Sequence, residues 1–146
     1  LSNFGGVKRR MELLGTVRGI EVYDDFAHHP TAIDTTLEGA RKRLGERKLW
    51  AIIEPRSNTM RMGSHKDGLA HSARLADEVI WYQPEGLDWD LQPVIDAATN
   101  QAQIARSLDD IISKITHEAG EGDAVVIMSN GGFGGLHQKL IQALKA

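Results

Sequence analysis

The residues best suited to chemistry form one run, 24–30 (DDFAHHP), in which two carboxylates are followed closely by two imidazoles. An apolar stretch over 19–23 precedes this run and is typical of a β-strand. Pro30 suits the first turn of a helix, where a missing N–H costs nothing. The pattern therefore places acids and imidazoles between a strand and a helix N-terminus, a position that favours anionic ligands.

Two further polar segments follow apolar stretches in the same way. The apolar stretch 49–53 leads into 54–61 (EPRSNTMR), and the stretch 124–128 leads into 129–135 (SNGGFGG). Because the carboxyl ends of parallel strands meet at one edge of a sheet, we expect these three loops to line one cleft. That cleft would combine acids, imidazoles, guanidinium groups and bare backbone.

Alternating strands and helices must position these loops. Periodicity and turn residues predict strands at 11–17, 20–23, 49–53, 78–82, 103–105 and 124–128, and helices or helical turns at 30–44, 69–76, 94–98, from Ser107 onward and at 135–144. Arg18 and Gly19 form the expected hairpin turn between the first two strands. The alternation predicts an α/β fold, Rossmann-like, with a mostly parallel sheet, an antiparallel edge and helices on both faces.

Composition limits the classes of function. The 146 residues form one domain, with 41% apolar and 25% charged residues. Seventeen basic against twenty acidic residues argue against nucleic-acid binding, and no apolar run is long enough for a membrane span. The absence of cysteine excludes disulfides, thiolate metal sites and a catalytic thiol. The chain begins at Leu1, and we expect it to be a piece of a longer, cytoplasmic protein.

Neither the glycine-rich turn nor the histidine pair completes a standard motif. The turn 130–135 matches neither G-x-G-x-x-G with its partner acid nor the P-loop pattern, so a backbone cradle for a ligand and a simple permissive turn both stay open. A hydrolase with metal ligands at 24, 25, 28 and 29 is disfavoured, because neither H-x-H nor H-E-x-x-H spacing is present. We therefore assign no metal site.

Four segments in this order resemble the C-terminal domain of the Mur ligases. They are 4–12 (FGGVKRRME), 24–30, the strand ending in Pro55-Arg56 and the glycine-rich turn after the last strand. The resemblance covers essentially the whole chain. It implies an ATP-driven amide ligase of three domains, of which this is the third, amine-substrate-binding one. The other two would hold the UDP-sugar and the ATP phosphates with Mg²⁺, so this domain alone is expected to be inactive.

The resemblance extends to two branches of the family. The His-His-Pro sequence is similar to the branch that joins L-alanine to UDP-N-acetylmuramate. The run 56–61 and the final turn depart from that branch and resemble the one that returns the tripeptide L-alanyl-γ-D-glutamyl-meso-diaminopimelate to UDP-N-acetylmuramate in peptidoglycan recycling. We expect the tripeptide, and keep the alanine ligase and a noncatalytic nucleotide-binding module as alternatives.

The resemblance also implies roles for individual residues. Arg10 would reach an ATP phosphate, Asp25 would accept hydrogen bonds from the ATP ribose, and His28 would lie against the nucleotide. The implied peptide-binding residues are His29, Arg56, Ser57, Asn58, Thr59, Arg61, Asn130, Gly131 and Gly132, with Phe133 closing the far wall. Planar guanidinium donors suit the carboxylates of such a peptide. Plain turn and packing roles stay open for Ser57, Thr59 and Phe133, and no residue is assigned a catalytic role.

Overall fold

The computed structural model describes residues 11–27, 30–54, 66–83, 91–129 and 133–145. Its strands are β1 (Glu12–Val17), β2 (Ile20–Asp25), β3 (Leu49–Ile53), β4 (Glu78–Tyr82), β5 (Gln101–Ala105) and β6 (Ala124–Met128). Its helices are α1 (Pro30–Leu44), α3 (Lys66–Ser72), α4 (Gln92–Ala97), α5 (Leu108–Glu118) and α6 (Leu136–Lys145), the last preceded by the short 3₁₀ turn η2 (Phe133–Gly135). No helix in these described stretches is long and apolar enough to cross a membrane.

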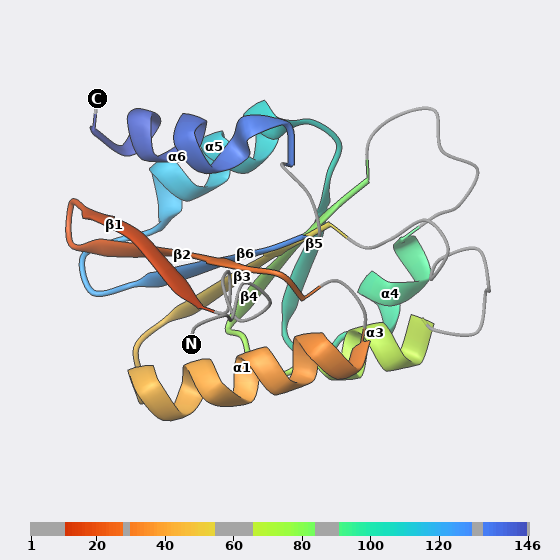
Figure 1. Cartoon of the computed structure of the whole chain (residues 1–146). Coiled ribbons are helices and arrows are strands. Elements are labelled where there is room, and N and C mark those ends of the chain that lie inside the picture. Colours follow the sequence, from red (N-terminus) through yellow and green to blue (C-terminus); the bar gives the residue numbers. More distant parts are fainter. Residues whose placement is uncertain (1–10, 28–29, 55–65, 84–90, 130–132, 146) are drawn as a thin grey trace, which may run out of the picture.

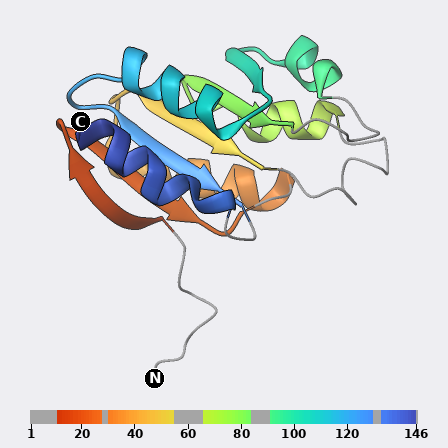
Figure 2. The ribbon, with the colours of Figure 1, turned by 90° about the horizontal axis from the view of Figure 1, so that it is seen from above.

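The six strands form one sheet in the order β1-β2-β6-β3-β4-β5. Only β1 and β2 pair in antiparallel fashion, across the hairpin turn in which Arg18 and Gly19 both have positive φ. All other pairs are parallel. Figure 1 shows the sheet between two helical layers, with α5 and α6 on one face and α1 and α3 on the other, and Figure 2 shows the first layer from above. The predicted fold class is therefore confirmed.

Each face of the sheet carries its own hydrophobic cluster. Along β3, Leu49, Ala51 and Ile53 pack toward α1, whereas Trp50 and Ile52 pack toward α5 and α6. This alternation follows from the two-residue repeat of side chains along a strand. Every residue of β3 and β6 is buried, as expected for central strands of a parallel sheet covered on both sides.

One predicted helix boundary is wrong. The apolar spacing predicted a helix over 69–76, whereas α3 spans Lys66–Ser72. The chain then turns, because the amides of Ala73 and Ala76 donate to carbonyls only three residues earlier. Asn100, distant in sequence, donates to the carbonyls of Ala73 and Ala76 at 2.9 and 2.8 Å. This remote cap satisfies the carbonyl groups that a longer helix would have used.

Two strands are longer than predicted, and one of these differences matters for function. β5 begins at Gln101, because pairing with Glu78 of β4 extends the edge. β2 continues to Asp25, which pairs with Met128 of β6. Asp24 and Asp25 are therefore the last two residues of a buried strand, and not part of a turn. Consecutive strand residues face opposite sides of a sheet, so their two carboxylates point to different faces.

Candidate functional site

The strand ends converge at one edge of the sheet. Asp25 of β2 and Ile53 of β3 both pair with Met128 of β6, and Ile53 pairs with Trp81 of β4. These carboxyl ends lie toward the right of Figure 1. The predicted convergence of strands 20–23, 49–53 and 124–128 at one edge is thus confirmed for the strands themselves. Most predicted site residues lie outside the described residues: Arg10, His28, His29, Arg56, Ser57, Asn58, Thr59, Arg61, Asn130, Gly131 and Gly132.

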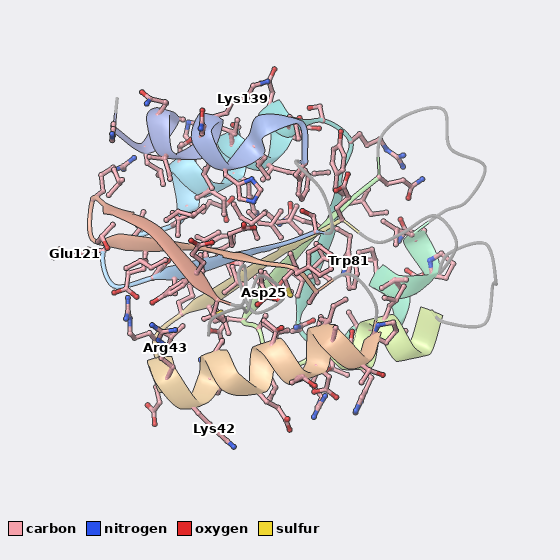
Figure 3. All side chains as sticks on the ribbon, in the orientation of Figure 1. Asp25, Lys42, Arg43, Trp81, Glu121 and Lys139 are labelled. Carbon is pink, nitrogen blue, oxygen red and sulfur yellow. The ribbon has the colours of Figure 1, made fainter. Side chains whose placement is uncertain are left out.

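Asp25 is buried on the α1 face, with 3% of its surface exposed. Its Oδ1 accepts a hydrogen bond from the Met11 amide at 2.8 Å. Its Oδ2 accepts from the Ala27 amide and from the Thr36 hydroxyl, each at 2.9 Å. Figure 3 shows Asp25 between the sheet and α1. We refer to Asp25 with these three donors as the Asp25 clasp.

The Asp25 clasp connects three separate segments of the chain to the end of β2. Met11 immediately precedes β1, Ala27 lies in the loop after β2, and Thr36 belongs to α1. Charged hydrogen bonds of this length are among the stronger ones in proteins. The clasp therefore holds Met11, before β1, close to Ala27, after β2, and to α1. That Asp25 also accepts hydrogen bonds from an ATP ribose stays a prediction.

Asp24 belongs to the opposite face and contacts the last helix. The Nε2 of His137 lies 2.9 Å from Oδ1 of Asp24, and the two side chains are only 16% and 11% exposed. Because His137 lies in the first turn of α6, the contact ties that helix to the carboxyl end of β2. Sequence reasoning missed His137, since only the apolar face of this helix had been considered. Its position two residues after the glycine-rich turn was the available signal.

Glu54 follows β3 on the same face as Asp24. Its backbone amide donates to the Met128 carbonyl at 3.0 Å, so its position is fixed by the sheet. Its side chain is half-buried, and burial raises the pKa of its carboxyl group above the ordinary value. Within the described residues, no donor or cation pairs with this carboxylate. The negative charge of Glu54 also helps to raise the pKa of Tyr82, after the larger contribution of burial.

Tyr82 lies beside Glu54 on this face, and a second aromatic ring packs against Tyr82. Tyr82 ends β4, and its ring centroid lies 5.1 Å from that of Phe133, with the ring planes at 44°. Phe133 is 4% exposed and has a φ of +52°, a left-handed conformation that bulky residues rarely adopt. Phe133 was predicted to close the far wall of the peptide pocket. In the structure its side chain is buried and its backbone is strained, and its role toward a peptide stays a prediction.

The chemistry of the edge therefore differs between its two faces. The α1 face holds a carboxylate whose charge is satisfied internally, and the α5/α6 face holds the Asp24–His137 pair, Glu54 and two aromatic rings. Among the residues that the structure describes, no group of three or more potential ligands could hold a metal ion. Two surface hollows lie elsewhere, one lined by Lys48, Glu78 and Gln101 at the amino ends of the strands and one between α3 and α4.

Comparison with known proteins places this arrangement in context. Residues 9–131 match the sequence profile of the family described as "Mur ligase, glutamate ligase domain". The chain is 46% identical over 145 residues to the UDP-N-acetylmuramate–L-alanyl-γ-D-glutamyl-meso-2,6-diaminoheptandioate ligase of Escherichia coli (strain K12). The aligned region covers 99% of this chain and 32% of that protein. The chain thus spans about a third of the length of this relative.

Two solved structures are similar to this chain in both sequence and fold. A murein peptide ligase from Psychrobacter arcticus 273-4 is 61% identical, with a TM-score of 0.91 over 99% of this chain and 32% of the other. A domain from a candidate UDP-N-acetylmuramate:tripeptide ligase of Haemophilus ducreyi 35000HP is 40% identical, with a TM-score of 0.79 over 92% of this chain and 98% of the other. The crystallised chain of that second protein is therefore little more than the matched region.

Proposed function

The chain belongs to the Mur ligase family, as its glutamate ligase domain, and from this we propose that it is the C-terminal, amine-substrate-binding domain of a three-domain ligase. The matched relatives are about three times as long, which leaves room for the two domains that would hold the UDP-sugar and the ATP phosphates. The site we infer for this domain is the carboxyl edge of the sheet, where an incoming amine would meet the activated partner.

The reaction we propose is the ATP-dependent joining of L-alanyl-γ-D-glutamyl-meso-diaminopimelate to UDP-N-acetylmuramate in the cytoplasm. The observation that carries this proposal is the 46% identity, over nearly the whole chain, to a ligase named for those two substrates. The muramate carboxylate would be phosphorylated by ATP, and the peptide amine would then displace the phosphate. Catalysis in such a reaction consists largely of positioning and charge neutralisation.

Members of this family use ATP and Mg²⁺. We propose that the central domain supplies most of the Mg²⁺ ligands. From this chain, Arg10, Asp25 and His28 would contact ATP on domain closure. The proposed peptide-binding residues are His29, Arg56, Ser57, Asn58, Thr59, Arg61, Asn130, Gly131 and Gly132.

Steady-state kinetics of the full-length enzyme test this proposal. We expect phosphate release from ATP to depend on UDP-N-acetylmuramate with the tripeptide, and L-alanine to be a poor replacement. Equal kcat/KM values for L-alanine and the tripeptide would favour the alanine ligase. The isolated domain is expected to fold and to hydrolyse no ATP, so turnover by a clean sample would refute the proposed division of labour between domains.

Two substitutions in the full-length enzyme test the roles of the arginines. Arg56→Ala should raise the KM for tripeptide by about ten- to a hundredfold, because a charge-assisted hydrogen bond to a carboxylate is worth about 1.5–3 kcal/mol. Arg10→Ala should lower kcat while the tripeptide KM is retained. An unchanged peptide KM in Arg56→Ala would contradict the assignment of the peptide pocket.

A further inference from the structure

We propose that Glu54, which lies beside Tyr82, receives the α-ammonium group of the incoming peptide and accepts its proton, an inference that rests on the proposed function. Neither Glu54 nor Tyr82 was assigned to substrate chemistry by the sequence motifs. They come together because β3 and β4 are paired and end at one edge of the sheet.

The first argument is the environment of the Glu54 carboxylate. The two other carboxylates at this edge are engaged within the domain, Asp25 by its three donors and Asp24 by His137. Glu54 is half-buried, and no cation or donor of the described residues pairs with it. Burial of a charged group without a partner is unfavourable, so a fixed carboxylate of this kind is suited to a cationic ligand.

The second argument is the ring of Tyr82 beside it. This half-buried ring packs, tilted by 44°, against the buried ring of Phe133, whose backbone has a positive φ. Backbone strain of this kind is concentrated at functional sites. An ammonium group is attracted both by a carboxylate and by the faces of aromatic rings. A phosphate or carboxylate ligand would be repelled by Glu54, so the chemistry of this subsite selects an amine.

The third argument is the proton balance of the reaction. A peptide amine arrives as R–NH₃⁺ and must become R–NH₂ before its lone pair can attack. Transfer of that proton to Glu54 gives the neutral carboxylic acid, a form that burial favours, since it raises the pKa of this group. The amine nitrogen then bonds to the acyl carbon, and the bond from that carbon to the phosphate oxygen breaks. Phosphate leaves with that electron pair and takes up the second proton of the amine.

The test uses the full-length enzyme with Glu54→Gln, which keeps the shape of the side chain and removes its charge. We expect kcat/KM for the tripeptide to fall by about a hundredfold or more, the size typical of general acid–base groups, with the KM for ATP unchanged. Hydroxylamine is neutral at neutral pH and needs no ammonium subsite. Hydroxamate formation from UDP-N-acetylmuramate and ATP should therefore proceed at the wild-type rate in this variant.

A matched control is Glu38→Gln, which changes an exposed carboxylate on α1 and should leave every rate within twofold. If Glu54→Gln ligates the tripeptide within twofold of an active wild-type enzyme, the subsite is refuted and the proposed function stands. The subsite is also refuted if the loss disappears with a peptide whose diaminopimelate is replaced by an amine-free residue, since Glu54 would then bind the distal ammonium. If the wild-type enzyme ligates no tripeptide, the proposed function itself fails and the subsite with it.

Discussion

Asp25 and Glu54 are carboxylates at the same edge of the same sheet, where the two strands that flank β6 end, and they differ in their internal partners. Asp25 faces α1 and accepts hydrogen bonds from three donors of its own domain. The alternation of side chains along β3 assigns Glu54 to the α5/α6 face, and it pairs with no donor of the described residues. The charge of Asp25 therefore stabilises the fold, whereas the charge of Glu54 is available, in our proposal, to bind the ammonium group of the peptide.

The difference shows how a single strand-end position can be used in two ways. A carboxylate that accepts hydrogen bonds from its own domain, as Asp25 does, lowers the free energy of the folded state. A carboxylate left half-buried and unpaired raises that free energy slightly, and the cost is recovered only when a cation binds. The pattern of internal hydrogen bonds therefore separates structural from substrate-binding acids more clearly than their closeness to the edge does.

The largest expected effect comes from removing the clasp. Asp25→Ala leaves two amides and a hydroxyl without their acceptor, so we expect the free energy of unfolding to fall by about 3–5 kcal/mol. Asp25→Asn should cost less, because its amide oxygen can still serve the two donors on one side. Urea unfolding of the domain measures both changes. Glu38→Ala is the matched control, and equal losses in Glu38→Ala and Asp25→Ala would show that the clasp contributes nothing.

The Asp24–His137 pair tests whether the α5/α6 face is held together as the α1 face is. His137→Ala should lower the free energy of unfolding by about 1–2 kcal/mol, since it removes a hydrogen bond to a largely buried carboxylate. His117, exposed near the end of α5, provides the control substitution. A loss as large as that of Asp25→Ala would remove the contrast between the two faces.

A smaller effect isolates one hydrogen bond of the clasp. Thr36→Val keeps the shape of the side chain and removes the donor to Asp25, and we expect a loss of about 1 kcal/mol in unfolding free energy. Thr35→Val is the matched control on the same helix, because the Thr35 hydroxyl donates only to the exposed carbonyl of Thr31. The two variants should differ in thermal unfolding midpoint, and an identical midpoint would argue against a role for Thr36.

The smallest effect has the opposite sign. Burial raises the folded-state pKa of Glu54 above its unfolded value, so the stability linked to its protonation is complete at low pH and is lost as pH rises through the folded pKa. Glu54→Gln should therefore stabilise the domain at neutral pH by less than about 1 kcal/mol, because solvent screens a half-exposed group. The gain should vanish near pH 4. Destabilisation at neutral pH would indicate an internal partner for this carboxylate.

Much of the scaffold could be predicted from local pattern. The boundaries of β3, β4, β6 and α1 follow directly from apolar runs and from Pro30, and Ser107 caps α5 by accepting from the Asp110 amide, as its spacing predicted. The parallel order of these strands then fixed which edge would carry the loops. The fold class and the convergence of the strand ends are thus encoded in short stretches of sequence.

What the sequence could not reveal depends on contacts between distant residues. The end of α3 is set by Asn100, more than twenty residues away. The strand character of Asp24 and Asp25 depends on pairing with β6, and no local pattern distinguishes it from a polar turn. Glu54 was passed over because a single acid before Pro55 has no motif, and its significance lies in the absence of a partner for its carboxylate among the described residues.

The position of β6 in the sheet has a consequence for how the domain is made. β2 and β3 do not pair with each other, and β6 joins both of them. Until β6 has been synthesised, the described strands can pair only as the β1–β2 hairpin and the three strands β3, β4 and β5, with a gap between them that β6 must fill. Such long-range closure is slow compared with local folding. The two halves of the sheet edge can therefore meet only after β6 has been synthesised.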